Sequence, residues 1–410
     1  MFNYDVIVVG GGAAGLMAAG KSAEIGKKVL LIEKMNQPGR KLRITGKGRC
    51  NLTNHKPLRE FLSHIGENSR FLKHAFSIFF VEQLISFFRE KGVEITVERG
   101  DRVFPTSEKA QDIFNALVTW VEKNRVKIKK DTSVKEIIVD YNKVIGVKVS
   151  ENEKYFAPKV ILATGGASYP ATGSTGDGYK IAEKAGHKII PAKPALVPIE
   201  TKGDIALQLQ GLSLKNVKAS FWLYGKKLGD EFGEMLFTHF GLSGPIILTL
   251  SRRFCNELSE KKPIVCSIDL KPALDDKQLD NRLLKDLNEH GKMQFKSITR
   301  NWLPGKLAEI FPDLIGIPHE KLCNQINAEE RKRIRKWLKD FKFEIIGTRG
   351  FNEAIITSGG IDLNEIDPKT MQSKIISGLY FAGEVIDLDA DTGGYNLQIA
   401  FSTAWLSAIS

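Results

Sequence analysis

The sequence predicts an α/β fold in which a domain built on a parallel sheet is interrupted by a long inserted segment. A strand, a glycine-rich turn, a helix and a second strand follow one another over residues 4–33, and a strand, a glycine-flanked turn and a helix close the chain after residue 377. Between them the composition becomes β-rich (191–270) and then helical (271–342). We therefore expect one discontinuous domain over 1–190 and 345–410, and an inserted domain over 191–344.

The N-terminal segment has the pattern of a βαβ unit. "YDVIVV" is apolar and β-branched, as expected of a strand buried on both faces, and "KKVLLIE" has the same character. Gly10, Gly12 and Gly15 match G-x-G-x-x-G between the first strand and the helix, and Glu33 ends the second strand. This combination is typical of a Rossmann domain that binds a dinucleotide.

Each residue of this pattern has a chemical reason. Gly10 permits the tight turn, Gly12 lets backbone N–H groups approach a pyrophosphate, and Gly15 lets the helix pack closely on the strand. The N-terminus of the helix adds partial positive charge. Glu33 can accept hydrogen bonds from both hydroxyls of an adenosine ribose and would repel a 2′-phosphate. The site therefore favours FAD or NAD over NADP.

The C-terminal segment distinguishes FAD from NAD. "LYFAGE" predicts a strand that ends at Gly383 and Glu384, where an acidic side chain can hold the ribityl or pyrophosphate region. "TGGYNLQIAFSTA" then opens a helix behind Gly393 and Gly394. Its N-terminal amides can point at the N1–C2=O edge of a flavin, where negative charge accumulates on reduction.

Five motifs together carry a family resemblance. "DVIVVGGGAAGLMAA", "GRKLRITGKGRCNLTN", "ATGGASYPATGSTGDGY", "LFTHFGLSGPIIL" and "GLYFAGEVIDLDADTGGYNLQIAFSTA" resemble the BaiN-like flavoproteins, whose members are often labelled NAD(P)/FAD-dependent oxidoreductases or aminoacetone oxidase family FAD-binding enzymes. The resemblance spans essentially the whole chain. It implies a glutathione-reductase-like FAD-binding Rossmann domain with an inserted β-barrel-like domain and a small helical domain.

The resemblance also implies which residues lie at the FAD. These are Gly10, Gly12, Gly15, Glu33, Lys34, Arg40, Lys41, Cys50, Val134, Gly165, Glu384, Asn396 and Leu397. We add their neighbours Ala14, Thr164, Gly383 and Gly394, and Arg49 as a cation for the pyrophosphate or for an anionic substrate. Lys47 stands where members often have a glycine. "GRKLRITGKGRC" is not a phosphate-binding P-loop, because Lys41 and Gly48 stand where that motif needs Gly and Ser or Thr.

Three side chains are candidates for the chemistry. Cys50 is either an acid that protonates a substrate carbon, with a pKa lowered by cations such as Arg49, or a small residue packed beside the cofactor. His239, in "FTHFGLSGP", is either an acid/base group or a structural histidine. Tyr395 directly precedes the predicted C-terminal helix, and it either contacts the flavin pocket or packs.

Composition and charge limit the remaining possibilities. The four cysteines form no CxxC pair and no Cys/His cluster, so we expect no metal site and no disulfide framework. Neither a signal peptide nor a membrane-spanning stretch is evident, so we expect a cytoplasmic protein without membrane contact. The net charge of +12 favours an anionic partner. "AEERKRIRKWLKDF" places Ile334, Trp337, Leu338 and Phe341 on an apolar stripe, and Arg331, Lys332, Arg335, Lys336 and Lys339 mostly elsewhere, as a solvated face or a contact to RNA phosphates.

Together these features predict an FAD-dependent oxidoreductase. Flavin N5 would exchange hydride with a substrate held under the inserted domain. No second G-x-G-x-x-G follows a convincing strand, so we expect no dedicated NAD(P)H domain. The flavin would be reduced by NAD(P)H as a transient donor, by the substrate itself, or by another donor. The substrate is either a small molecule or an RNA, and the latter reading is a dihydrouridine-synthase-type reductase of uridine in ribosomal RNA. A further reading is an RNA-binding protein, contacting ribosomal RNA through the basic inserted domain, with a structural FAD.

Overall fold

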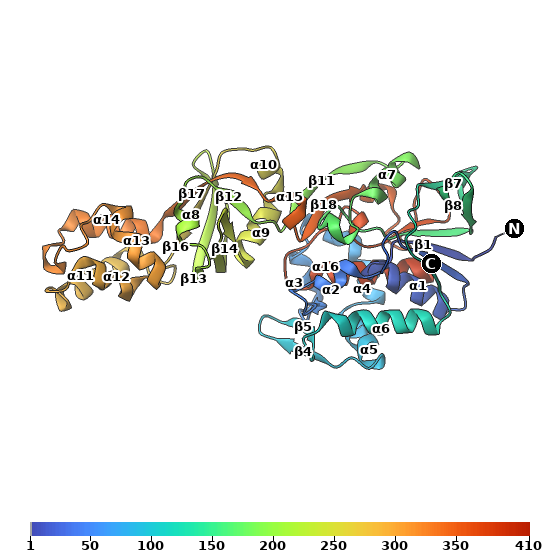
Figure 1. The fold of residues 1–410 in the computed structure, drawn as a ribbon, viewed down its shortest axis with the longest axis horizontal. Coiled ribbons are helices and arrows are strands. Elements are labelled where there is room, and N and C mark those ends of the chain that lie inside the picture. The colour runs from blue at the N-terminus through green and yellow to red at the C-terminus, as the bar shows by residue number, and fades with distance from the viewer. Residues whose placement is uncertain (1) are drawn as a thin grey trace. The chain divides into compact units, whose positions relative to one another are not determined.

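The computed structural model describes residues 2–410 and divides into two compact units (Figure 1). The first comprises the chain up to Ala195 together with Gly350–Ser410, and the second is Leu196–Arg349. Both junctions lie five residues beyond the boundaries expected from the sequence, and the strands explain why. The expected boundary at residues 190 and 191 falls inside strand β11 (Ile189–Ala195), which pairs antiparallel with β18 (Ile356–Ile361) of the same unit.

A five-stranded parallel sheet forms the centre of the first unit. Its order is β19-β10-β1-β2-β6, and every neighbouring pair is parallel. The strands are β1 (Val6–Val9), β2 (Val29–Ile32), β6 (Lys127–Lys129), β10 (Lys159–Leu162) and β19 (Leu379–Phe381). All residues of β1 and β2 are buried, as their unbroken apolar sequences require. Helix α1 (Ala13–Glu24) packs against α16 (Tyr395–Ile409) and α6 (Ala110–Lys123).

The remaining elements of the first unit extend this centre. A three-stranded sheet of order β3-β5-β4 consists of β3 (Thr53–Asn54), β4 (Ile95–Glu98) and β5 (Arg102–Pro105). The predicted β-meander is present as β7 (Glu136–Asp140), β8 (Lys143–Ser150) and β9 (Glu153–Phe156). The helices are α2 (Arg40–Ile44), α3 (Leu58–Ser63), η1 (Glu67–Leu72), α4 (Lys73–Ile78), α5 (Val81–Glu90), η2 (Pro170–Thr172), α7 (Asp177–Lys184), α15 (Gly350–Glu353), η4 (Leu363–Glu365) and η5 (Gly383–Val385).

The second unit contains a closed six-stranded barrel, which confirms the β-barrel-like insertion. Its order is β12-β15-β14-β13-β16-β17, from β12 (Ile199–Thr201), β13 (Ser213–Leu223), β14 (Lys226–Phe237), β15 (Gly241–Ser243), β16 (Ile264–Asp269) and β17 (Phe341–Thr348). Buried Phe221, Phe237 and Phe343 belong to its core. Its shorter helices are α8 (Ile205–Gln208), α9 (Pro245–Arg253) and α10 (Cys255–Ser259).

A helical segment completes the second unit. It consists of α11 (Asp276–Glu289), α12 (Phe295–Trp302), α13 (Gly305–Ile315), η3 (Cys323–Gln325) and α14 (Ala328–Lys339). The predicted apolar stripe of α14 is buried at Ile334 and Leu338 and half-buried at Trp337. Phe341 lies outside the helix, at the start of β17, but its ring still stacks on Trp337 at 4.2 Å.

No single helix within residues 2–410 has both the length and the apolar composition of a membrane span. One bent pair, Glu67–Ile78 with Val81–Glu90, passes the same test by length and composition only.

Candidate functional site

The glycine loop between β1 and α1 is shaped for close backbone approach. Gly10 has φ +99°, and a Cβ there would lie 2.6 Å from the carbonyl oxygen of Ala163 on the neighbouring strand. A Cβ on Gly15 would lie 1.7 Å from the carbonyl oxygen of Gly10. Gly12, in contrast, faces open space, and α1 begins there without a side-chain cap or an acidic residue in its first turn. The amides of this helix are therefore available to an anion.

Glu33 lies beside that loop, as the motif predicts. Its Oε2 accepts a hydrogen bond from the Gly11 N–H at 2.6 Å, and its Oε1 accepts one from the Met35 N–H at 2.8 Å. Thr132 N–H donates to the Glu33 carbonyl, which brings the buried Val134 segment to the same end of the loop. Two backbone donors thus fix the orientation of the carboxylate, and its remaining lone pairs can accept ribose hydroxyls.

The carboxyl ends of β10 and β19 bring further predicted residues to the same edge of the sheet. Thr164 and Gly165 follow β10, and Gly383 and Glu384 follow β19. A Cβ on Gly383 would lie 2.8 Å from the Cβ of Ala14, so the end of β19 touches the start of α1. Because parallel strands present their carboxyl ends at one edge, residues far apart in the sequence converge here.

An ion pair links this edge to α2. Lys41 Nζ lies 2.7 Å from Glu384 Oε2 and donates to Ser168 Oγ at 2.6 Å. Glu384 Oε1 in turn accepts from the Thr357 N–H at 2.8 Å. Sequence reasoning missed Ser168 and Thr357; the only signal was a Ser or Thr two positions from a glycine in "TGGAS" and "TSGG".

The other predicted cations lie in different surroundings. Lys34 Nζ contacts Thr175 Oγ1 at 2.5 Å and Asp177 Oδ2 at 2.6 Å, at the start of α7. Arg40 begins α2, and no ion pair to it occurs within residues 2–410. Arg49 pairs with Glu98 and Glu108, and its guanidinium lies over the Phe104 ring at 4.2 Å. The expectation that Arg49 neutralises the pyrophosphate or an anionic substrate gains no support, because two carboxylates already engage it.

Cys50 is a packed residue of the core. Its side chain is fully buried by the protein itself, and burial raises the pKa of its thiol to about 12. The expectation of a pKa lowered by Arg49 is therefore wrong, because desolvation of the thiolate is the dominant effect. A thiol that water does not reach is not positioned to protonate a substrate, so the structure favours the packing interpretation.

The turn before α16 is held by the loop that contains Cys50. A Cβ on Gly394 would lie 2.4 Å from the carbonyl oxygen of Thr53, and Asn54 Nδ2 donates to the Gly393 carbonyl at 3.3 Å. The side chain of Asn396 bonds the backbone of Ala390 in both directions. The Asn396 amide therefore shapes the turn. Helix α16 starts without a side-chain cap, so the N–H groups of its first turn, up to the half-buried Leu397, can bind a ligand.

Tyr395 and His239 occupy contrasting positions. Tyr395 is 2% exposed and stacks on the imidazole of His64, which sequence reasoning did not single out. Burial, together with the nearby Asp391 carboxylate, raises the pKa of Tyr395. His239 is exposed in the turn between β14 and β15 of the second unit, with its ring edge-on to Phe240 at 4.9 Å. Its role stays a prediction.

The residues present fit FAD. Two uncapped helix N-termini, those of α1 and α16, open behind glycine turns in the first unit, one suited to a pyrophosphate and the other to the electron-rich edge of a flavin. Glu33 suits the ribose between the pyrophosphate and the adenine. The hydroxyl of Thr164 is buried without a hydrogen-bond partner among the described residues, which is expected of a group that serves a ligand.

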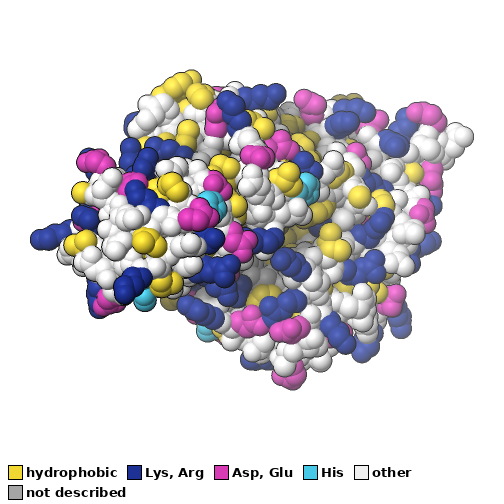
Figure 2. Space-filling view, turned by 60° about the vertical axis from the view of Figure 1, so that its left-hand side comes forward, with side chains coloured by type: hydrophobic (Ala, Val, Ile, Leu, Met, Phe, Trp, Pro, Cys, Tyr) yellow, Lys and Arg dark blue, Asp and Glu magenta, His cyan; other side chains and the backbone are white. Residues whose placement is uncertain are grey.

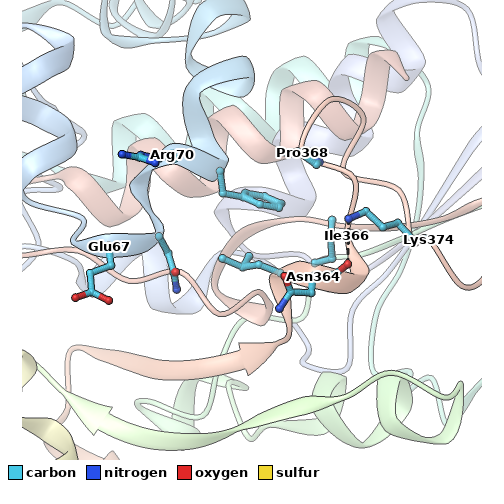
Figure 3. A pocket seen from close by; sticks show the side chains of 9 residues that line it. Glu67, Arg70, Asn364, Ile366, Pro368 and Lys374 are labelled. Atoms are coloured by element: carbon cyan, nitrogen blue, oxygen red, sulfur yellow. Dashed lines mark hydrogen bonds between the residues drawn. The ribbon is translucent and has the colours of Figure 1, made fainter.

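A shallow pocket of about 390 Å³ lies elsewhere on the first unit (Figure 3). It is lined by η1 and by the loop around residues 363–374, and Lys374 Nζ donates across it to the Asn364 carbonyl at 3.0 Å. Figure 3 shows the side chains of Glu67 and Arg70 pointing away from Ile366. None of the predicted site residues lines this pocket.

Comparisons with known proteins concern the whole chain. The family described as "HI0933-like protein Rossmann domain" matches residues 4–410. A ribosomal RNA dihydrouridine synthase of Escherichia coli (strain K12) is 33% identical over 100% of this chain and 98% of its own length. A 3-dehydro-bile acid Δ4,6-reductase of Clostridium scindens is 29% identical over 98% of this chain and 97% of its own length.

Among solved structures, a 3-ketosteroid Δ1-dehydrogenase from Sterolibacterium denitrificans matches with a TM-score of 0.53 and 14% identity. That match covers 99% of this chain and 98% of the dehydrogenase, and it concerns the fold. The chain therefore belongs to the HI0933-like Rossmann-domain family, and it is an FAD-dependent oxidoreductase.

Proposed function

We propose that this protein is a cytoplasmic, flavin-dependent reductase of uridine in ribosomal RNA, with NAD(P)H as the electron donor. One observation carries the proposal. Two curated relatives, from E. coli and Haemophilus influenzae, are named ribosomal RNA dihydrouridine synthases, and they are 33% and 32% identical to this chain over at least 97% of their own lengths. Similarity over the full length of both proteins includes the inserted unit as well as the cofactor site.

The chemistry of the relatives' names supports a shared reaction type. Forming dihydrouridine adds two hydrogens to the C5=C6 bond of uracil, which is conjugated to a carbonyl. A Δ4,6-reduction of a 3-dehydro-bile acid also adds two hydrogens to a carbon–carbon double bond conjugated to a ketone. FAD supplies hydride chemistry when bound, and conjugation makes such a bond a hydride acceptor.

Charge favours the RNA substrate over the small molecule. The chain carries a net charge of +12. On α14, Arg331 and Arg335 pair with Asp280, and Lys339 pairs with Asp269, but Lys332, Arg333 and Lys336 remain exposed. Lys332 and Lys336 form no ion pair within residues 2–410, so they can meet phosphates. Figure 2 shows lysines and arginines spread over the visible face rather than gathered in one patch.

Mapping dihydrouridine in ribosomal RNA tests this function. We expect deletion of the gene to remove a dihydrouridine from the large or small ribosomal RNA, and a plasmid-borne wild-type copy to restore it. A Gly12→Ala copy should fail to restore it, because the change closes the open approach at the pyrophosphate loop. An unchanged map in the deletion strain would remove the proposal. Restoration by a copy that binds no FAD would show that the cofactor does no chemistry in this modification, which would favour a role in RNA binding.

A further inference from the structure

Reduction of a carbon–carbon double bond requires a proton as well as a hydride. The proton must come from an acid that the substrate can reach. Cys50 is fully buried, and Tyr395 is 2% exposed beneath another ring. Neither of these two candidates of the first unit is an accessible acid.

His64 lies on top of Tyr395 and is accessible. It is the C-cap of α3, and 33% of its side chain is exposed. Its imidazole stacks on the Tyr395 ring with centroids 4.5 Å apart and an interplanar angle of 19°. Because Tyr395 is the first residue of α16, the imidazole is held at the helix N-terminus that suits the flavin edge.

A buried carboxylate orients this imidazole. His64 Nδ1 lies 3.0 Å from Asp391 Oδ2, and the Asp391 side chain is 6% exposed. The backbone adds a second tie, since the Asp391 N–H donates to the His64 carbonyl at 2.9 Å. With Nδ1–H donated to the carboxylate, Nε2 becomes the nitrogen that exchanges a proton with its surroundings.

Asn396 holds the backbone segment that carries this carboxylate. Its side-chain amide donates to the carbonyls of Ala390 and Asp391 at 2.8 and 3.2 Å, which holds the turn that carries Asp391. His64, Asp391 and Asn396 therefore link a partly exposed imidazole to the first turn of α16. Burial and the carboxylates of Asp391, Asp101 and Glu60 raise the pKa of Tyr395. Lys56 pairs with the last two of these carboxylates.

We propose that His64 is the catalytic acid of the reduction and that Asp391 is its positioning residue. FAD, when bound and reduced, would supply the hydride to one carbon of the double bond and would itself be oxidised. His64 Nε2 donates the proton to the other carbon, so that the substrate gains two hydrogens, and His64 regains its proton from water. The inference rests on the proposed function, because it assumes a conjugated double bond as the acceptor.

Asp387 is the rival acid in the same turn region. Burial raises the pKa of its carboxyl to about 6, with further contributions from Asp389 and Asp362, so it retains a proton in mildly acidic solution. Its own backbone N–H is bonded to the Ile361 carbonyl rather than to the ring stack. The experiment below separates the two acids.

The test uses the holoenzyme reduced with dithionite under anaerobic conditions, which removes any dependence on the donor. It is mixed with ribosomal RNA from the deletion strain and, separately, with 4-androstene-3,17-dione as a small conjugated enone. Return of oxidised-flavin absorbance gives the rate. We expect His64→Gln to slow this step about 100-fold or more and Asp391→Asn about 10-fold or more. His74→Gln, an exposed histidine on α4, and Asp387→Asn should stay within about threefold of wild type.

A second measurement does not depend on turnover. In NMR spectra of the holoenzyme, the His64 Nδ1 proton should be protected from exchange and should lose that protection in Asp391→Asn. Flavin content and thermal unfolding exclude misfolding of the variants. A rate for His64→Gln within about threefold of wild type, or loss of turnover in Asp387→Asn instead, overturns the inference. If wild type reduces only the enone, the uridine proposal is wrong. The rates of wild type and His64→Gln with the enone then decide whether His64 is the acid. If wild type reduces neither probe, both proposals are wrong.

Discussion

Cys50 adopts φ 60°, a backbone conformation that residues with a Cβ rarely occupy. Its N–H donates to the Thr45 carbonyl at 2.9 Å, and Ala110 N–H donates to the Gly48 carbonyl at 2.7 Å, so the loop is tied on both sides. A small side chain suits this position, because a larger one would add volume to a closed core. Cys50 therefore has a packing role in this loop rather than a role in substrate protonation.

Replacing Cys50 tests that conclusion. We expect Cys50→Ala to lower the free energy of unfolding by about 1 kcal/mol through lost packing, and to keep FAD content and turnover within about twofold of wild type. Cys266→Ala is the matched control, since Cys266 is equally buried in the second unit and its thiol pKa is also raised to about 12. Loss of turnover in Cys50→Ala with full FAD content would restore the acid role.

Asp387 gives a second prediction at this scale. Because its folded-state pKa of about 6 exceeds that of an unfolded aspartate, the folded state binds more protons between about pH 4 and 6. Ionisation of Asp387 therefore destabilises the fold as pH rises through this window. We expect Asp387→Asn to be more stable than wild type at pH 7.5, by about 1–2 kcal/mol in urea unfolding, and to lose this advantage at pH 4. A difference that does not change with pH would refute the assignment.

At the scale of elements, the β1–α1–β2 unit was predictable and the convergence of the other loops was not. Glycine spacing and the acid at residue 33 report local contacts, and the structure shows the Glu33–Gly11 bond that they imply. Ser168 and Thr357 meet Glu384 only because β10, β18 and β19 lie together in space, and no local pattern carries that information. The burial of Cys50 was hidden for the same reason.

The glycine loop can be tested by a pair of variants. Gly12→Ala adds a Cβ that meets no protein atom within 4 Å, so we expect wild-type folding but FAD affinity lowered about 10-fold or more. Gly15→Ala adds one 1.7 Å from the Gly10 carbonyl oxygen, so we expect the fold itself to be destabilised. Gly305→Ala in α13 meets no atom and should change neither property. Unaltered FAD affinity in Gly12→Ala would place the pyrophosphate elsewhere.

For the whole molecule, the order of elements predicted two units, and pairing across the chain set their limits. Strand β11 contains two prolines, which are rare inside paired strands, yet it pairs with β18 through a register shift between Ile190 and Lys193. Strand β17 closes the barrel and thereby extends the inserted unit to Arg349. Composition along the chain indicated roughly where the inserted unit begins and ends. The residues at which it begins and ends depend on strand partners far apart in the sequence.

The proposed function requires that FAD carry hydride from NAD(P)H to a conjugated double bond. Anaerobic stopped-flow spectroscopy of the purified holoenzyme measures both half-reactions directly, the reduction of the flavin and its reoxidation. We expect NADH or NADPH to bleach the flavin and ribosomal RNA from the deletion strain to restore its absorbance, with dihydrouridine as the product. A flavin that neither nucleotide reduces, or a reduced flavin that this RNA leaves unchanged, would contradict the proposed function.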